Sequence, residues 1–330
     1  MLVDCHAHVI PPMLLAWLRE HAAVVGARWE QRADGTEILS IGGRWPFPLK
    51  PVFSDLRAFL DEQTAAGVVC SLISPVPQLF LYDAEAGVAA EFAHLYNHAV
   101  VAWCRQAPGR LLGLATVPLQ DPAQAATELA WAMGQGLSGA ILGPGCAGRL
   151  LSDAMFTPFW EEADRLGAIV FLHPLLSTDP RLGRPQVPNI IGVPWETTVA
   201  AVDLIFGGIL DRYPKVRILL AHGGGYLPYQ LGRFEQGYAV WPQLRSQLQD
   251  RPHAYLRRFW YDTVLWRSEA IAFLRSVVGA DRIVPGSDYP FDLSVWPPSA
   301  EVTEGVQTLL GSALAGHSEP SGEEPATAGA

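Results

Sequence analysis

Histidine and aspartate residues that could bind a metal ion stand close together at the start of the chain. Asp4, His6 and His8 alternate within its first apolar run. Side chains two positions apart on a β-strand point to the same side, so His6 and His8 can hold one cation from a single strand. Asp4 can point the same way below them. The alternative, a pair of ordinary core histidines, is left open by this strand alone.

Three later apolar runs also end in such a residue, namely His173, His222 or Asp288. If the runs are parallel strands of a barrel, they all end at one face, and the side chains converge there. Three histidines and one carboxylate with a position left open are typical of a catalytic metal site. We therefore predict one divalent cation bound by His6, His8, His173 and Asp288. The donor set favours Zn²⁺, with Mn²⁺ as the alternative.

His222 is best placed as a general acid/base beside a water molecule that the cation activates, with the role of a fifth ligand as the alternative. The three glycines after it permit either close approach of a substrate or a tight turn into the next helix. The remaining histidines are expected to be surface or packing residues: His21, His94, His98, His253 and His317.

These residues need a scaffold of alternating strands and helices. Short, almost continuously apolar runs, as expected of parallel strands buried on both faces, occur at 2–8, 68–74, 110–117, 139–142, 168–173, 216–222, 259–264 and 282–288. Helical stretches lie between them, near 55–66, 84–107, 121–134, 155–166, 196–212, 226–236 and 268–278. The pattern predicts an α/β fold, a (β/α)8 TIM-type barrel. An open doubly wound sheet is less favoured because no glycine-rich loop follows the first strand.

We expect one barrel domain over residues 1–311. Residues 26–52 interrupt the alternation after strand one, and the turn signals Asp34-Gly35 and Gly42-Gly43 predict a small β-hairpin insertion over the barrel mouth. Residues 299–314 are a candidate for a short last helix. Residues 312–330, rich in Gly, Ala, Ser, Pro and Glu, are expected to be a disordered tail.

Composition excludes several classes of protein. The chain has 330 residues, is 49% hydrophobic and carries a net charge of −10, which argues against nucleic-acid binding. It contains no apolar run long enough for a membrane span and no recognisable signal peptide. Its four cysteines form no CxxC pair. A cytoplasmic enzyme acting on a small molecule is the expected class.

The motifs together resemble the amidohydrolase superfamily. The resemblance is carried by Asp4-x-His6-x-His8, by His173-Pro174, by His222 with its three glycines, and by Gly286-Ser287-Asp288-Tyr289-Pro290-Phe291. More narrowly, the run from Gly192 to Thr198, including Trp195, is similar to the amidohydrolase-related branch that contains 2-amino-3-carboxymuconate-6-semialdehyde decarboxylase. The resemblance spans roughly residues 1–292.

The resemblance implies a mononuclear site with His6, His8, His173 and Asp288 as ligands and His222 as acid/base, and it implies a homodimer. The branch contains non-oxidative decarboxylases of aromatic or unsaturated acids as well as hydrolases and hydratases of ring-cleavage products. Decarboxylation, with Asp288 or a water linked to His222 as proton donor, is the favoured prediction. The alternatives are hydrolysis or hydration by a metal-bound water, and a binding protein with a relic site.

This sequence departs from the branch where two arginines hold the substrate's carboxylates. A gap-free count places Phe47 and Trp241 at those positions, with Arg44 or Lys50 as possible substitutes for the first. Trp195 is a further candidate for lining the pocket. Two aromatic residues in place of two cations predict a less anionic, more aromatic carboxylic acid as substrate.

Overall fold

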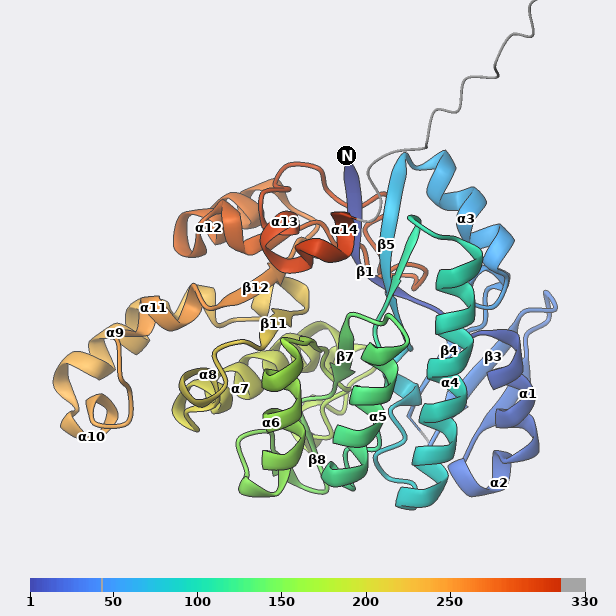
Figure 1. Cartoon of the computed structure of the whole chain (residues 1–330), viewed down its shortest axis with the longest axis horizontal. Coiled ribbons are helices and arrows are strands. Elements are labelled where there is room, and N and C mark those ends of the chain that lie inside the picture. Colours follow the sequence, from blue (N-terminus) through green and yellow to red (C-terminus); the bar gives the residue numbers. More distant parts are fainter. Residues whose placement is uncertain (43, 316–330) are drawn as a thin grey trace, which may run out of the picture.

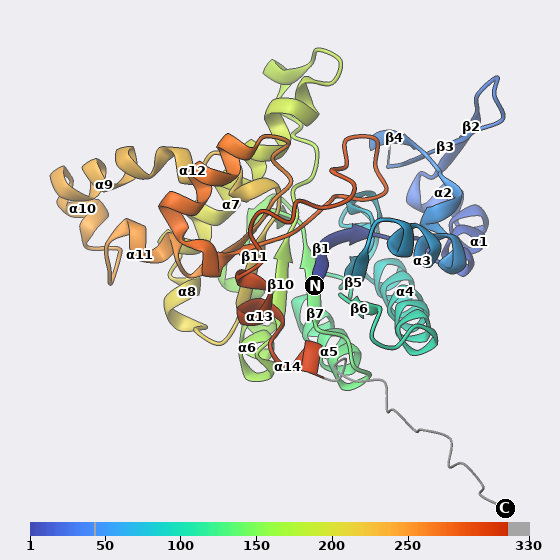
Figure 2. The same cartoon turned by 90° about the horizontal axis from the view of Figure 1, so that it is seen from above.

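The computed structural model describes residues 1–42 and 44–315. Within them, eight parallel strands form the central barrel (Figures 1 and 2). The barrel strands are β1 (Leu2–His8), β5 (Val68–Ser74), β6 (Leu111–Gly113), β7 (Gly139–Leu142), β10 (Ile169–Leu172), β11 (Arg217–Leu220), β12 (Phe259–Asp262) and β13 (Ile283–Val284). Each of the predicted apolar runs contains one of them.

The strands close into a ring. Ladder hydrogen bonds join them into two sheets, in the orders β1-β5-β6 and β13-β12-β11-β10-β7. Parallel bridges from Ala115 to Ala140 and from Ala7 to Tyr289 join the two sheets at both seams. The prediction of a barrel with parallel strands is therefore confirmed, and the open doubly wound sheet is excluded.

Helices surround this barrel, and their starts follow local sequence signals. Asp55 caps α3 by accepting a hydrogen bond from Ala58 N at 3.1 Å, and Asp121 caps α5 by accepting one from Gln124 N at 3.1 Å. No helix in the described ranges is both long and apolar enough to cross a membrane. The helices are α1 (Pro12–Glu20), α2 (Ala22–Val25), α3 (Leu56–Ala65), α4 (Ala86–Gln106), α5 (Pro122–Gly134), α6 (Thr157–Leu166), α7 (Val193–Phe206), α8 (Ile209–Arg212), α9 (Leu231–Val240), α10 (Pro242–Arg245), α11 (Pro252–Leu256), α12 (Ser268–Val278), α13 (Gly305–Leu310) and α14 (Ser312–Ala315).

The last two helices pack against the barrel near the chain's N-terminus (Figure 2). Leu309 and Leu310 of α13 and Leu314 of α14 belong to the same buried cluster as Val3 and other side chains of the barrel strands. The candidate helix over 299–314 is thus represented by two short helices. Helix α14 occupies the first four residues of the expected tail, and residues 316–330 lie outside the described ranges.

The insertion after strand one is a three-stranded antiparallel sheet rather than the predicted hairpin. Its strands are β2 (Arg28–Gln31), β3 (Glu37–Ile41) and β4 (Arg44–Pro48). Both turn signals reverse the chain, which adds the third strand: Gly35 has φ 86° and Gly42 has φ 59°. Beyond β4, Lys50 Nζ donates a hydrogen bond to the Pro290 carbonyl at 2.7 Å. The insertion therefore contacts the segment that follows Asp288.

Candidate metal centre

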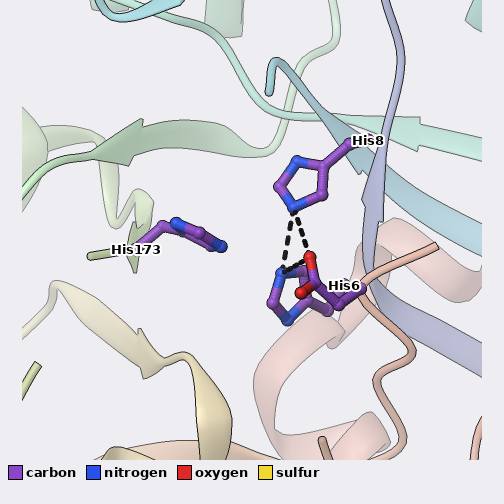
Figure 3. A group of neighbouring side chains, drawn as sticks. His6, His8 and His173 are labelled. Atoms are coloured by element: carbon purple, nitrogen blue, oxygen red, sulfur yellow. Dashed lines mark hydrogen bonds and ion pairs between the residues drawn. The ribbon is translucent and has the colours of Figure 1, made fainter. Parts of the chain in front are cut away.

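The four predicted ligands come together at the carboxyl ends of the barrel strands (Figure 3). One nitrogen or oxygen atom from each of His6, His8, His173 and Asp288 lies within 4.8 Å of the others. Nε2 of His6 is 3.0 Å from Nε2 of His8. Oδ1 of Asp288 is 3.1 Å from Nε2 of His8 and 3.2 Å from Nε2 of His6.

The donor atoms fit a divalent cation. Figure 3 shows the ring of His173 directed toward those of His6 and His8. Its Nε2 is buried and has no hydrogen-bond partner among the described residues. A buried polar atom without a partner costs about 1–3 kcal/mol, and a cation would remove that cost. Three imidazole nitrogens and one carboxylate oxygen form a set that suits Zn²⁺ or Mn²⁺.

Each histidine is oriented through its other ring nitrogen. Nδ1 of His8 lies 2.9 Å from the Pro75 carbonyl, and Nδ1 of His173 lies 2.9 Å from the Pro174 carbonyl. A carbonyl oxygen only accepts hydrogen bonds, so both Nδ1 atoms carry the proton, and both Nε2 atoms keep a free lone pair. Such partners of metal-binding histidines fix the ring and its tautomer.

The electrostatics of the cluster favour positive charge. Burial by itself would lower the pKa of His6, but the carboxylates of Asp288 and Asp262 outweigh it and raise that pKa to about 10. Burial would raise the pKa of Asp288, yet His6 and the other imidazoles hold it well below its usual value. Burial also lowers the pKa of His173 well below that of a free histidine. The ionised carboxylate of Asp288 and the neutral imidazole of His173 favour a cation, which would take the place of the proton on His6.

His222 lies beside this cluster but is not one of its four residues. Its Nε2 lies 3.5 Å from Oδ2 of Asp288, while its Nδ1 is buried and unpaired among the described residues. His222 and Asp288 have φ values of 54° and 60°, in the left-handed region. That conformation is uncommon for residues other than glycine, although asparagine, aspartate and histidine adopt it more often than the rest, and residues held in it cluster at functional sites.

The glycines after His222 are explained by packing. A Cβ atom on Gly223 would lie 2.7 Å from the Leu265 side chain, and one on Gly225 would lie 2.1 Å from the Pro194 carbonyl oxygen. Both have positive φ values. Of the two interpretations made from the sequence, the tight turn into the following segment accounts for these glycines.

Sequence reasoning missed Asp262, the last residue of β12. Its Oδ2 lies 2.6 Å from Nδ1 of His6, and its Oδ1 accepts hydrogen bonds from Gly223 N at 2.9 Å and Val264 N at 3.1 Å. It therefore orients one predicted ligand and the turn that carries His222. The sequence carries only a weaker signal: Asp262 is the one charged residue of the run 259–264, but it stands inside that run, whereas Asp288 stands at the end of its own.

We expect Asp262→Asn to weaken metal binding by about 10- to 100-fold, because partners of metal-binding histidines contribute that much. The side-chain oxygen of asparagine can accept a hydrogen bond from His6 or from the two backbone N–H groups. In either case its NH₂ group faces the remaining donor, with which it cannot form a hydrogen bond. Competition with a chelator of known zinc affinity measures the effect.

Asp4→Asn is the matched control for that variant. Asp4 is equally buried, but its carboxylate accepts hydrogen bonds from Ser287 Oγ at 2.6 Å and from the His6 backbone N at 3.1 Å, not from a ligand imidazole. It joins the first strand to the segment before Asp288, and burial raises its pKa to about 7. Equal losses of metal affinity in both variants would show a general effect of burial and contradict the role assigned to Asp262.

The predicted substrate-binding residues occupy different places. The Phe47 ring is buried against Phe291, with centroids 5.7 Å apart, and Phe291 lies 5.3 Å from the His8 ring. Lys50 forms an ion pair with Asp292 at 2.9 Å and is therefore not a free cation. Arg44 begins β4, and its side chain lies outside the described part.

The two tryptophans lie farther along the chain. Trp195 is in the first turn of α7, and the Arg181 guanidinium lies 5.3 Å from its ring centroid. Trp241 follows α9 and is 57% exposed. It lies in a group of short helices, α9 to α11, that extends away from the barrel (Figure 1). Phe47 is thus close to the cluster, whereas Trp241 is outside the barrel of its own chain.

Comparisons with known proteins agree with this arrangement. The family model described as Amidohydrolase matches residues 3–315. The chain is 30% identical over 303 residues to 2-amino-3-carboxymuconate-6-semialdehyde decarboxylase of Dictyostelium discoideum, covering 90% of this chain and 83% of the relative. It is 28% identical over 273 residues to gamma-resorcylate decarboxylase of Rhizobium sp. (strain MTP-10005), covering 76% of this chain and 82% of the relative.

A solved structure shares the fold. The 5-carboxyvanillate decarboxylase of Novosphingobium aromaticivorans, complexed with manganese and 4-hydroxy-3-methoxy-5-nitrobenzoic acid, superposes with a TM-score of 0.73 at 21% identity. The match covers 89% of this chain and 87% of that one.

Proposed function

The chain belongs to the amidohydrolase family, and from that premise we propose that it is a metal-dependent non-oxidative decarboxylase of an aromatic carboxylic acid. The observation that carries the proposal is the buried group of His6, His8, His173 and Asp288 with His222 beside it. Relatives that match most of the chain are named as decarboxylases. Within the proposal, the first four residues hold the cation, and His222 and Asp288 handle the proton.

A single divalent cation belongs to this site. It would supply positive charge that holds the substrate carboxylate and an adjacent oxygen and stabilises negative charge that develops on them. We propose Zn²⁺, because imidazole nitrogen predominates in the donor set. Mn²⁺ is the alternative, supported by the manganese in the 5-carboxyvanillate decarboxylase structure. Metal analysis of protein purified without added metal distinguishes the two.

The residues around the cluster determine how a substrate binds. Phe291, backed by Phe47 and Phe53, provides an apolar wall beside His8 on which an aromatic ring can pack. Since Lys50 is neutralised by Asp292, it offers little attraction to a second carboxylate. We therefore propose a substrate with one carboxylate and otherwise aromatic character, such as a hydroxybenzoic acid.

Decarboxylation requires one proton placed on the carbon that carries the carboxylate. His222 and Asp288, 3.5 Å apart, can share such a proton. When the ring carbon has taken the proton, the bond to the carboxylate breaks. Its electron pair restores the aromatic ring, and CO₂ leaves. Solvent then returns a proton to the pair.

A product assay tests this function. Zn- and Mn-loaded protein is incubated with a panel of hydroxybenzoic acids and ring-cleavage products, and CO₂ and the decarboxylated product are measured together. We expect equimolar release of both from an aromatic acid. Uptake of oxygen-18 from water into the organic product, without CO₂, would instead establish hydrolysis or hydration.

We further propose a homodimer in the cytoplasm. Trp241 is a large exposed apolar side chain on the segment that extends from the barrel, as expected for a residue covered by a second copy (Figure 1). Sedimentation at micromolar concentration is expected to give a dimer that Trp241→Glu weakens. A wild-type monomer under those conditions would contradict the proposal.

The cytoplasmic location is proposed because the described cysteines are free thiols, as expected of a protein in a reducing compartment. Cell fractionation tests it.

A further inference from the structure

Two histidines on the outer surface lie in an arrangement that the decarboxylase site does not use. His94 and His98 are one turn apart on α4, and their Nε2 atoms are 3.1 Å from each other. Their ring centroids are 4.5 Å apart at an interplanar angle of 82°. We propose that His94 and His98 form a second, surface site for one transition-metal ion that prefers imidazole nitrogen, such as Zn²⁺ or Ni²⁺.

The ligand pair inside the barrel provides an internal comparison. The Nε2 atoms of His6 and His8 are 3.0 Å apart, and their rings also meet at 82°. Two nitrogens bound about 2.0–2.1 Å from a tetrahedral zinc ion lie roughly 3.3 Å apart. The surface pair therefore has nearly the same geometry as the buried pair, and both need only a small displacement to hold an ion.

A carboxylate orients one ring of the surface pair, as Asp262 does for His6. Nδ1 of His94 lies 3.0 Å from Oε2 of Glu128 on α5. Glu128 also accepts a hydrogen bond from Asn97 Nδ2 at 2.8 Å, and Asn97 Oδ1 accepts one from Thr116 N at 2.9 Å. The carboxylate is therefore held in place before any ion binds. With its Nδ1 proton given to Glu128, His94 presents the lone pair of Nε2 to the ion.

The surroundings leave one side of the pair open. The ring of Trp131 lies 4.6 Å from that of His94 and 4.3 Å from that of His98, which restrains both rings from one direction. The His94 side chain is 48% exposed and that of Glu128 only 12%. Water can thus complete the coordination of an ion. With two protein ligands, the site is expected to bind more weakly than the four-residue cluster, and hard ions such as Mg²⁺ should not compete.

Zinc binding to the full-length, untagged protein, stripped of metal and then measured by equilibrium dialysis, tests the proposal. We expect two equivalents in the wild type, one tight and one weak. His94→Ala and His98→Ala should each lose only the weak one, and His173→Ala only the tight one. Glu128→Gln should weaken the second site by about 10- to 100-fold. Wild-type protein should also be retained on an immobilised nickel column, and His98→Ala should elute earlier.

His253→Ala is the matched control. His253 is 53% exposed and, like His94, places Nδ1 near a carboxylate, 3.5 Å from Oε1 of Glu235. Among the described residues no second histidine contacts it. This variant should keep both equivalents and the nickel retention. A single equivalent in the wild type would overturn the proposal. So would unchanged binding in His98→Ala, in which case the two rings only share an N–H···N hydrogen bond.

Discussion

Replacing His222 with alanine is expected to lower kcat by about 10²- to 10⁴-fold, the usual contribution of a positioned proton donor, while the cation stays bound. The loss of kcat is expected without loss of the cation because His222 is not one of the four residues that hold it. The four-residue cluster closes without His222, whose Nε2 reaches only Oδ2 of Asp288 at 3.5 Å. Steady-state kinetics on an aromatic acid, together with metal analysis of the same preparation, measure both quantities.

The backbone at this position calls for a second variant. His222 has a φ of 54°, which alanine adopts only with strain, whereas asparagine tolerates it. His222→Asn should therefore retain the fold and the metal and show the same loss of kcat. Loss of the metal from His222→Asn would make His222 a fifth ligand. Full activity in that variant would remove it from the reaction.

Replacing His173 with alanine is expected to abolish metal binding in the barrel and, with it, activity. His173 contributes one of the four ligand atoms, which lie within 4.8 Å of one another. The loss of affinity should exceed the roughly 10- to 100-fold effect of removing a partner that only orients a ligand. The measurement is best made with His98→Ala as the parent protein, so that the surface site does not contribute to the zinc count.

Thermal unfolding gives a second readout of the same variant. An ion that binds only the folded protein stabilises it by about 2.7 kcal/mol at a concentration one hundred times its Kd. The Tm of the parent protein should therefore rise with added zinc, whereas that of the His173→Ala protein should not. A zinc-dependent Tm in the variant would mean that three ligands suffice, and the cluster would need a different assignment.

Much of the barrel is readable from the sequence because its strands are buried on both faces. Such strands appear as short apolar runs, and their carboxyl ends must meet, which is why His173 and Asp288 can be grouped with His6 from residue types alone. The insertion was less predictable. Each of its two turns can end a hairpin or continue a sheet, and pairing with the neighbouring strand decides between them.

Asp262 and the surface pair show what local patterns leave out. Asp262 looks like the ordinary end of a strand until the ring of His6, 256 positions earlier, is placed beside it. His94 and His98 are spaced for contact on any helix, but their rings acquire a shared orientation only from Glu128 and Trp131 on the next helix. In both cases the information lies in tertiary contacts.

The span of chain between the ligands has a consequence for biosynthesis. His8 and Asp288 are 280 positions apart, and Asp4 and Ser287 join the same two segments. A nascent polypeptide on the ribosome cannot assemble the complete cation site until nearly all of the barrel has emerged from the exit tunnel. Acquisition of the catalytic ion is thus a late event in the synthesis of the barrel. A chain halted before its last strand would carry the three ligand histidines without the Asp288 carboxylate that completes the set.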